Sequence, residues 1–209
     1  MPYAEADAPA ARHAPATEVH GCRRALVIAD DIGVFLAVAR SLGRAGVATD
    51  VATSEHHYPG LASRYVNRVH AAAPYVSHTA EWIEALEGLI RSHDYGLVVP
   101  TNDASLRLLA EHADRLGRDR LAIPNRAALD AFADKAATRT LAEAANVPMA
   151  EGVSVTPGTT PAELERSLGL PLIVKPRSSY RPGRAHAKVA AALATSAEEL
   201  ARALAEMRD

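Results

Sequence analysis

Short apolar runs alternate with amphipathic stretches over the first half of the chain. Five runs bounded by polar or turn residues predict strands, namely RALVIAD (24–30), VATDVATS (47–54), YVNRVHA (65–71), YGLVVPT (95–101) and RLAIPN (120–125). Between them, apolar residues at helical spacing predict helices over residues 31–46, 79–93 and 102–117. Alternating strands and helices are typical of a parallel sheet with helices on both faces, so we predict an open α/β domain over residues 23–125.

The pattern changes after residue 125. Two short helices are expected to meet near Asp134, and Asn146-Val147-Pro148 ends the second of them. The elements predicted after them are a capped helix TTPAELERSLG (159–169), strands LPLIVKP (170–176) and HAKVAAALA (186–194), and a helix SAEELARALAEM (196–207). This order predicts an α+β arrangement over residues 126–209.

The first 22 residues carry no structural pattern. They mix Ala and Pro with scattered charges and contain no continuous apolar run, so residues 1–22 are predicted to be a disordered leader. An organelle-targeting peptide is the alternative, and the acidic residues in this segment argue against it.

The charge of the whole chain is nearly balanced. Lys and Arg number 23 against 25 Asp and Glu, for a net charge of −2, so no overall field attracts nucleic acid or an anionic membrane, and we expect neither partner. Cys22 is the only cysteine, which excludes an internal disulfide and fits a reducing compartment, so we expect the cytoplasm. Only His56 and His57 are close together among the histidines, and no metal site is predicted from them.

Polar residues follow three of the predicted strands. They are Asp30 and Asp31, then Ser54, then Thr101, Asn102 and Asp103. Ligands of open α/β sheets bind beyond the carboxyl ends of the strands, so a substrate site at this edge is one interpretation. The other is that Asp31 and Asp103 cap the helices that follow them. A dinucleotide site is excluded at the first strand-to-helix turn, because ADDIGVFLA has one glycine and two aspartates.

The strand predicted near residue 172 ends in a cation. The continuous run Leu172-Ile173-Val174 predicts a strand covered on both faces, and Lys175 and Pro176 follow it. A buried ammonium group without a partner is costly, so Lys175 must reach solvent or meet an anion. Pro176 holds Lys175 in an extended conformation, so its side chain continues the alternation of the strand.

The loop after Lys175 is basic. No acidic residue occurs from Gly169 to Ser196. The loop carries cations, hydroxyls and one glycine, namely Arg177, Ser178, Ser179, Arg181, Gly183, Arg184 and Lys188. Such a loop could fold over a polyphosphate and supply donors to it. A solvated basic loop is the other interpretation.

A second lysine favours the phosphate interpretation. Lys135 follows Asp134 at the start of the predicted helix KAATRTLAEAANV. The helix dipole disfavours a cation at that end by about 0.3–1 kcal/mol. A phosphate bound beside Lys135 would reverse this effect.

Three motifs follow one another in the second half of the chain: DKAATRTLAEAANVPMA (134–150), LGLPLIVKPRSS (168–179) and TSAEELARAL (195–204). In order and spacing they resemble the ATP-grasp superfamily, in its carbamoyl-phosphate-synthetase-like or carboxylate-amine-ligase-like branch, over residues 134–207. Residues 24–125, with SRYVNRV (63–69) and PTNDASL (100–106), similarly resemble the α/β preATP-grasp domain that precedes it.

The resemblance implies a nucleotide site. Its candidate residues are Lys135, Lys175, Arg177, Ser178, Ser179 and Gly183. The two lysines match the phosphate-binding lysines of the family, and residues 177–185 match its mobile phosphate-covering loop, although the family loop is usually glycine-rich and this one has arginines around a single glycine. The implied cofactors are ATP and Mg²⁺, and the implied reaction phosphorylates a small carboxylate to an acyl phosphate, which an amine or another nucleophile attacks. The family's metal ligands and catalytic arginine belong to a second subdomain, which has no counterpart in this sequence.

Three interpretations of the chain stay open. In the first, the chain is part of a longer ligase, with a preATP-grasp domain over 23–125 and an incomplete first ATP-grasp subdomain over 126–209. In the second, it is a truncated, non-catalytic paralogue that serves as a binding or assembly module. In the third, it is half of a fold that a partner chain or a homodimer completes. Whether it is an ATP-dependent carboxylate-amine ligase therefore depends on whether the second subdomain is supplied. The intact mass of the native polypeptide, compared with 22.1 kDa for this chain, separates the first interpretation from the others.

Overall fold

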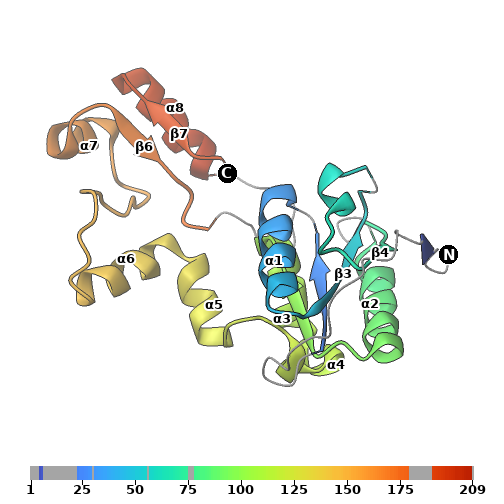
Figure 1. Ribbon diagram of the computed structural model, residues 1–209. Helices are drawn as coiled ribbons and strands as arrows, with labels where there is room; N and C mark the ends of the chain where they lie inside the picture. The colour runs from blue at the N-terminus through green and yellow to red at the C-terminus, as the bar shows by residue number, and fades with distance from the viewer. Residues whose placement is uncertain are drawn as a thin grey trace. The chain divides into compact units, whose positions relative to one another are not determined.

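The computed structural model describes residues 5–6, 23–29, 31–55, 57–74, 78–178 and 190–208 (Figure 1). The chain divides into two compact units, Met1–Ile123 and Pro124–Asp209.

The first unit is built on a five-stranded sheet in the order β1-β4-β3-β2-β5. Its strands are β1 (Glu5–Ala6), β2 (Arg24–Ile28), β3 (Ala48–Thr53), β4 (Arg68–Ala71) and β5 (Leu97–Pro100). The last four pair in parallel, and only β1 is antiparallel to its neighbour. The parallel sheet predicted from the alternating pattern is therefore confirmed.

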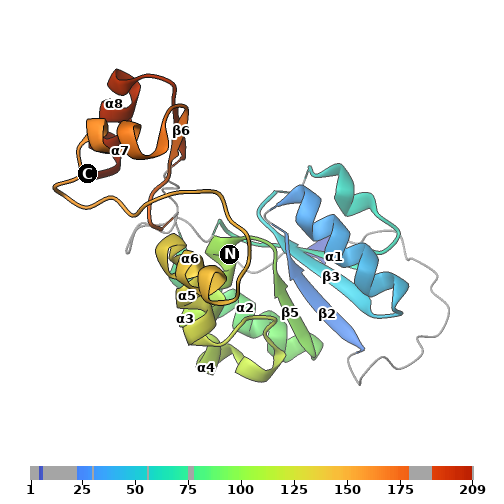
Figure 2. The ribbon, with the colours of Figure 1, turned by 90° about the vertical axis from the view of Figure 1, so that its left-hand side faces the viewer.

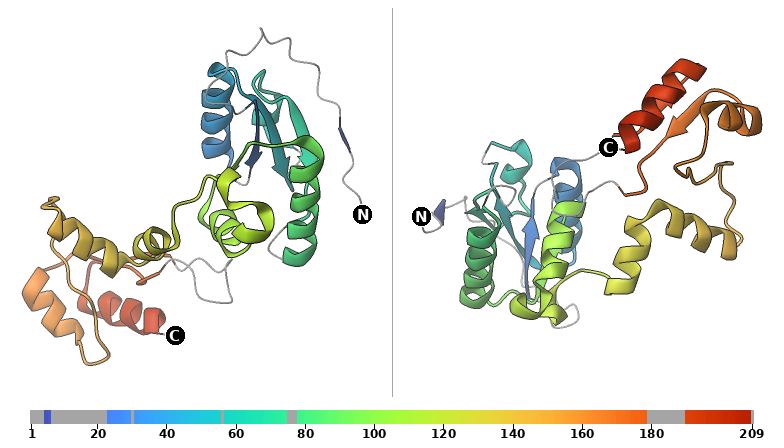
Figure 3. Two further views of the ribbon diagram at one scale, coloured as in Figure 1. Left: turned by 90° about the horizontal axis from the view of Figure 1, so that it is seen from below. Right: turned by 180° about the vertical axis from the view of Figure 1, so that it is seen from behind.

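Helices cover both faces of this sheet (Figure 3, left). They are α1 (Ile32–Arg44), α2 (Thr79–His93), α3 (Asp103–Glu111) and α4 (Ala113–Leu116), with short 3-10 turns at Pro59–Ala62 and Arg118–Arg120. The central strand β2 is buried from both sides: Leu26 and Ile28 share a core with α2, α3 and α4, whereas Val27 packs with Phe35 and Ala39 of α1.

Two predicted elements of this unit differ from the structure. The helix predicted over 102–117 is interrupted at His112, where φ is −110° and ψ is 18°. The strand predicted over 120–125 is reduced to a single bridge between Leu121 and Val98, because a 3-10 turn occupies Arg118–Arg120 immediately before it. Within the segment 1–22, for which disorder is predicted, Glu5–Ala6 pair with His70 and Val69 of the edge strand β4; residues 1–4 and 7–22 lie outside the described residues.

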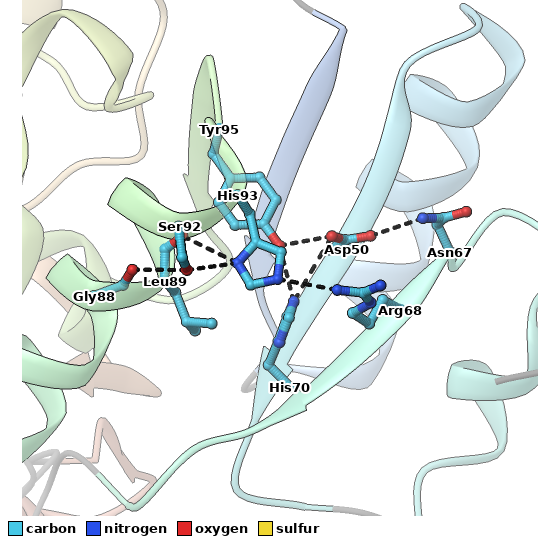
Figure 4. Close-up of polar contacts among 9 residues, drawn as sticks. All are labelled: Asp50, Asn67, Arg68, His70, Gly88, Leu89, Ser92, His93 and Tyr95. Atoms are coloured by element: carbon cyan, nitrogen blue, oxygen red, sulfur yellow. Dashed lines mark hydrogen bonds and ion pairs between the residues drawn. The ribbon is translucent and has the colours of Figure 1, made fainter. Parts of the chain in front are cut away.

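A buried polar network joins β3, β4 and the chain that follows α2 (Figure 4). The Tyr95 hydroxyl donates to Asp50 Oδ2 at 2.6 Å, and the Asn67 amide donates to Asp50 Oδ1 at 3.1 Å. His70 Nε2 lies 2.8 Å from the Tyr95 hydroxyl oxygen. Because the tyrosine donates its one hydroxyl hydrogen to Asp50, His70 Nε2 must be the donor to Tyr95. Burial raises the pKa of Asp50, but the hydrogen bonds from Tyr95 and Asn67, together with His70 Nε2 at 3.7 Å from Oδ2, outweigh it and hold this pKa below its ordinary value.

The network continues to the end of α2. Arg68 donates to His93 Nε2 at 3.0 Å, so this nitrogen carries no hydrogen. His93 Nδ1 lies 2.8 Å from Ser92 Oγ, whose own hydrogen is donated to the Gly88 carbonyl at 2.9 Å. His93 Nδ1 is therefore the donor to Ser92, and the Leu89 carbonyl lies 3.3 Å from both of these side-chain atoms.

The second unit holds the remaining elements. They are α5 (Arg126–Ala133), α6 (Lys135–Ala144), α7 (Pro161–Leu168), β6 (Leu172–Val174), β7 (Ala192–Ala194) and α8 (Ala197–Arg208). The strands β6 and β7 form an antiparallel pair, and α7 and α8 lie beside it (Figure 2). Leu164, Ala194, Leu200 and Leu204 form the small buried core between the helices and the strands.

Candidate functional site

The strand β6 has one covered face and one open face. Leu172 and Val174 pack against the small core of the second unit, whereas Ile173 between them is 63% exposed. The prediction that this strand is covered on both faces is therefore wrong. The α7 and α8 helices contribute buried residues to one side of the strand pair only, and no described residue buries the other side.

The open face combines apolar and cationic side chains. Ile173 is paired across the strands with Leu193, which is also 63% exposed. Lys175 is exposed and follows Ile173 by two residues, so the strand alternation places both side chains on the same face. The exposed apolar pair of Ile173 and Leu193 therefore lies on the same face of the strand pair as Lys175, the lysine at the end of β6.

The second lysine is linked to the end of this strand by the backbone. Asp134 and Ser178 form an antiparallel bridge, and the Lys135 N–H donates to the Arg177 carbonyl at 2.9 Å. The structure thus brings together the start of α6 and the residues just beyond β6, which are about 40 positions apart in the sequence. Of the predicted site residues, Ser179 and Gly183 lie outside the described residues.

Asp134 has two separate contacts at this junction. Its Oδ1 accepts from the backbone N–H groups of Ala136 and Ala137, at 2.8 and 3.2 Å, and so caps α6. Its Oδ2 accepts from Arg177 Nε at 2.6 Å. Burial raises the pKa of Asp134, but these N–H groups and the Arg177 guanidinium together hold it below its ordinary value. The sequence did not reveal this ion pair.

Polar residues at the carboxyl ends of the strands in the large sheet form hydrogen bonds with other groups of the same unit. Asp31 accepts from the Val34 N–H at 3.0 Å, so its interpretation as a helix cap is confirmed. Asn102 rather than Asp103 caps α3, through a 2.8 Å bond from the Ser105 N–H. The Thr101 hydroxyl donates to the Ile28 carbonyl at 2.6 Å, which uses its donor within the fold.

The described residues offer neither a cluster of metal ligands nor a membrane-spanning helix. Among the placed side chains, no three or more His, Cys, Asp or Glu residues gather in a group that could hold a metal ion. None of the helices in the described ranges combines the length and the apolar character needed to cross a membrane.

Comparison with known proteins gave matches among solved structures. No family model and no curated protein matches the sequence. The L-amino acid ligase from Bacillus licheniformis is 15% identical and matches with a TM-score of 0.58, over 89% of this chain and 42% of that one. The N5-carboxyaminoimidazole synthetase from Staphylococcus aureus is 16% identical, with a TM-score of 0.59 over 93% of this chain and 46% of that one.

A third structure is the biotin carboxylase domain of the Hydrogenobacter thermophilus 2-oxoglutarate carboxylase, in complex with MgADP, ADP and bicarbonate. It is 14% identical and matches with a TM-score of 0.60 over 90% of this chain and 41% of that one. All three are ATP-grasp enzymes. The chain has the fold of their N-terminal region. It spans less than half the length of each of these ATP-grasp chains.

Proposed function

We propose that the second unit binds ATP as the nucleotide-binding part of an ATP-grasp ligase that activates a carboxylate for attack by an amine or another nucleophile. The observation that supports this most is the open face of β6 and β7, where exposed Ile173 and Leu193 adjoin Lys175. Exposed apolar pairs beside a cation suit a ligand that is flat and apolar at one end and anionic at the other.

ATP has this character, and the residues present fit it. The base would lie on Ile173 and Leu193, since stacking and apolar contact do not require charge. Lys175 and Lys135 would bind the phosphates, and Arg177 adds a planar fork suited to phosphate oxygens. The bridge between Asp134 and Ser178 keeps the two lysine-bearing segments together before any nucleotide arrives. Ser178, with Ser179 and Gly183 beyond it, would belong to the covering loop.

The chemistry assigned to these residues is binding and orientation. ATP with Mg²⁺ would supply the phosphoryl group that converts the carboxylate to an acyl phosphate. The lysines would hold the phosphates and offset their charge in line with the carboxylate. Mg²⁺ prefers carboxylate oxygens, and no three or more His, Cys, Asp or Glu side chains gather among the described residues. As the family resemblance implies, we expect the metal ligands in the second subdomain of the ATP-grasp fold.

The alternative is a non-catalytic binding or assembly module. A partner chain or a second copy that completes the fold would restore the metal site. Turnover of ATP by the purified chain alone would exclude the non-catalytic alternative.

The single cysteine fits a reducing environment. On this ground we propose that the protein is cytoplasmic.

Lys175→Ala tests the proposed site. Removing one charged donor to a phosphate should weaken ATP binding about 10- to 100-fold, measured by titration calorimetry. Arg166→Ala is the matched control, because it removes one positive charge from an exposed position of α7 in the same unit. Equal ATP affinity for the Lys175 variant and the parent would overturn the assignment.

A further inference from the structure

Asp134 does more than begin a helix. An N-cap needs one acceptor oxygen, and Asp134 supplies it with Oδ1. The other oxygen, Oδ2, is used entirely on Arg177 at 2.6 Å. The carboxylate is largely shielded, with 25% of its side chain exposed, whereas the Arg177 side chain is 77% exposed. One end of this ion pair is therefore fixed to a helix, and the other reaches into solvent.

The contact of Arg177 with Asp134 uses only Nε of the guanidinium and leaves the two terminal nitrogens able to bind a ligand. A guanidinium has five N–H donors, and the contact with Asp134 uses the Nε hydrogen. Within the ranges that the structure describes, Arg177 has no second side-chain partner. The two terminal nitrogens can therefore meet an anion while Nε stays on Asp134. Anchoring at Nε also removes much of the rotamer freedom that a free arginine would lose on binding.

The backbone brings Arg177 close to both lysines along the chain. The Arg177 carbonyl accepts from the Lys135 N–H at 2.9 Å. Arg177 also follows Lys175 by two residues, with Pro176 between them. Three basic residues from two segments are thus joined through the backbone, and the Asp134 carboxylate contacts the side chain of one of them, Arg177.

We propose that Asp134 is a positioning residue, which holds Arg177 through Nε so that its terminal nitrogens bind the ATP phosphates together with Lys135 and Lys175. This inference rests on the proposed function. The competing role for Asp134 is that of an internal anion: its carboxylate would occupy the Arg177 guanidinium until a phosphate displaces it. The two roles predict opposite effects when the carboxylate charge is removed.

Asp134→Asn in the full chain separates them. Asparagine caps helices as well as aspartate does, so α6 should keep its start, while the charged acceptor for Arg177 is lost. We expect ATP affinity to fall about 10-fold or more and the affinity for adenosine to stay unchanged, because only phosphates contact the arginine. Arg177→Ala should give a similar loss for ATP, and the double variant should lose little more than either single one.

Glu163→Gln is the matched control, because Glu163 belongs to the capping box of α7 and accepts from the Thr160 N–H at 2.8 Å. It should leave both affinities unchanged. An Asp134→Asn variant that binds ATP as tightly as the parent, or more tightly, overturns the positioning role. Equal losses for ATP and adenosine also overturn it, since they indicate a general structural defect. If Lys175→Ala still weakens ATP binding in either case, the proposed function stands without this inference.

Discussion

Replacing Asp50 with alanine is expected to lower the free energy of unfolding of the Met1–Ile123 unit by about 3–5 kcal/mol. The Asp50 carboxylate is fully buried and accepts from Tyr95 and Asn67, and the Tyr95 hydroxyl in turn accepts from His70. Removing the carboxylate leaves the buried Tyr95 hydroxyl without its acceptor and opens a cavity in the fold. The effect should exceed that of any exposed charge in the unit.

Urea unfolding followed by Trp82 fluorescence measures this change, because Trp82 is the only tryptophan and lies buried in the first unit. Tyr95→Phe should cost less, about 1–3 kcal/mol, since it removes one hydroxyl. Glu84→Ala on the exposed side of α2 should stay within about 0.5 kcal/mol of the parent. An Asp50 variant as stable as the Glu84 variant would contradict the expectation.

The same carboxylate sets a pH dependence. The native pKa of Asp50 lies below its ordinary value, so the native state binds its proton less readily than the unfolded chain. Its contribution to stability is therefore complete above about pH 4, the unfolded pKa, and is lost as the pH falls through the native pKa. The unfolding midpoint of the parent should drop over that acidic range more steeply than that of Asp50→Ala.

Leu200→Ala is expected to destabilise the second unit by about 2–5 kcal/mol. Leu200 lies at the centre of a core that contains only Leu164, Ala194 and Leu204 besides itself among the buried described residues. A core of this size has few contacts to compensate for a cavity. The strand pair that carries Ile173 and Lys175 rests on this core, so ATP binding should weaken with it.

Two optical signals separate the units in this experiment. Far-UV circular dichroism reports helices of both units, whereas Trp82 reports the first unit only. Leu200→Ala should move part of the dichroism transition to lower urea and leave the fluorescence transition in place. Leu193→Ala, on the open face, should change neither transition by much. Parallel movement of both signals would show that the units unfold as one.

Local periodicity was sufficient for most elements of the fold. The helix predicted over 79–93 coincides with α2, because Trp82, Leu86, Leu89 and Ile90 recur at helical spacing. The parallel sheet followed from strands separated by helices, and the buried character of β2 followed from its unbroken apolar run. These features depend on neighbours in sequence.

The misjudged features depend on residues far apart in sequence. Three consecutive apolar residues, as in β6, occur both in strands covered on one face and in strands covered on both faces. Which of the two applies to β6 depends on where α7 and α8 pack. The pair between Asp134 and Arg177 spans 43 residues and that between Asp50 and Tyr95 spans 45. Lys135 and Lys175 were singled out by their unusual places, at a helix start and a strand end, but nothing in the sequence marked Asp134 as the partner of Arg177.

The network around Asp50 also bears on which strand alignments the chain can adopt. Asp50 lies opposite Arg68 where β3 and β4 pair. A slip of β4 by one residue would turn His70 to the other face of the sheet, and the buried aspartate would no longer face His70. Apolar neighbours would tolerate such a slip far better, because their attraction has no direction. The network therefore disfavours misaligned pairings of β3 and β4 and so selects one alignment.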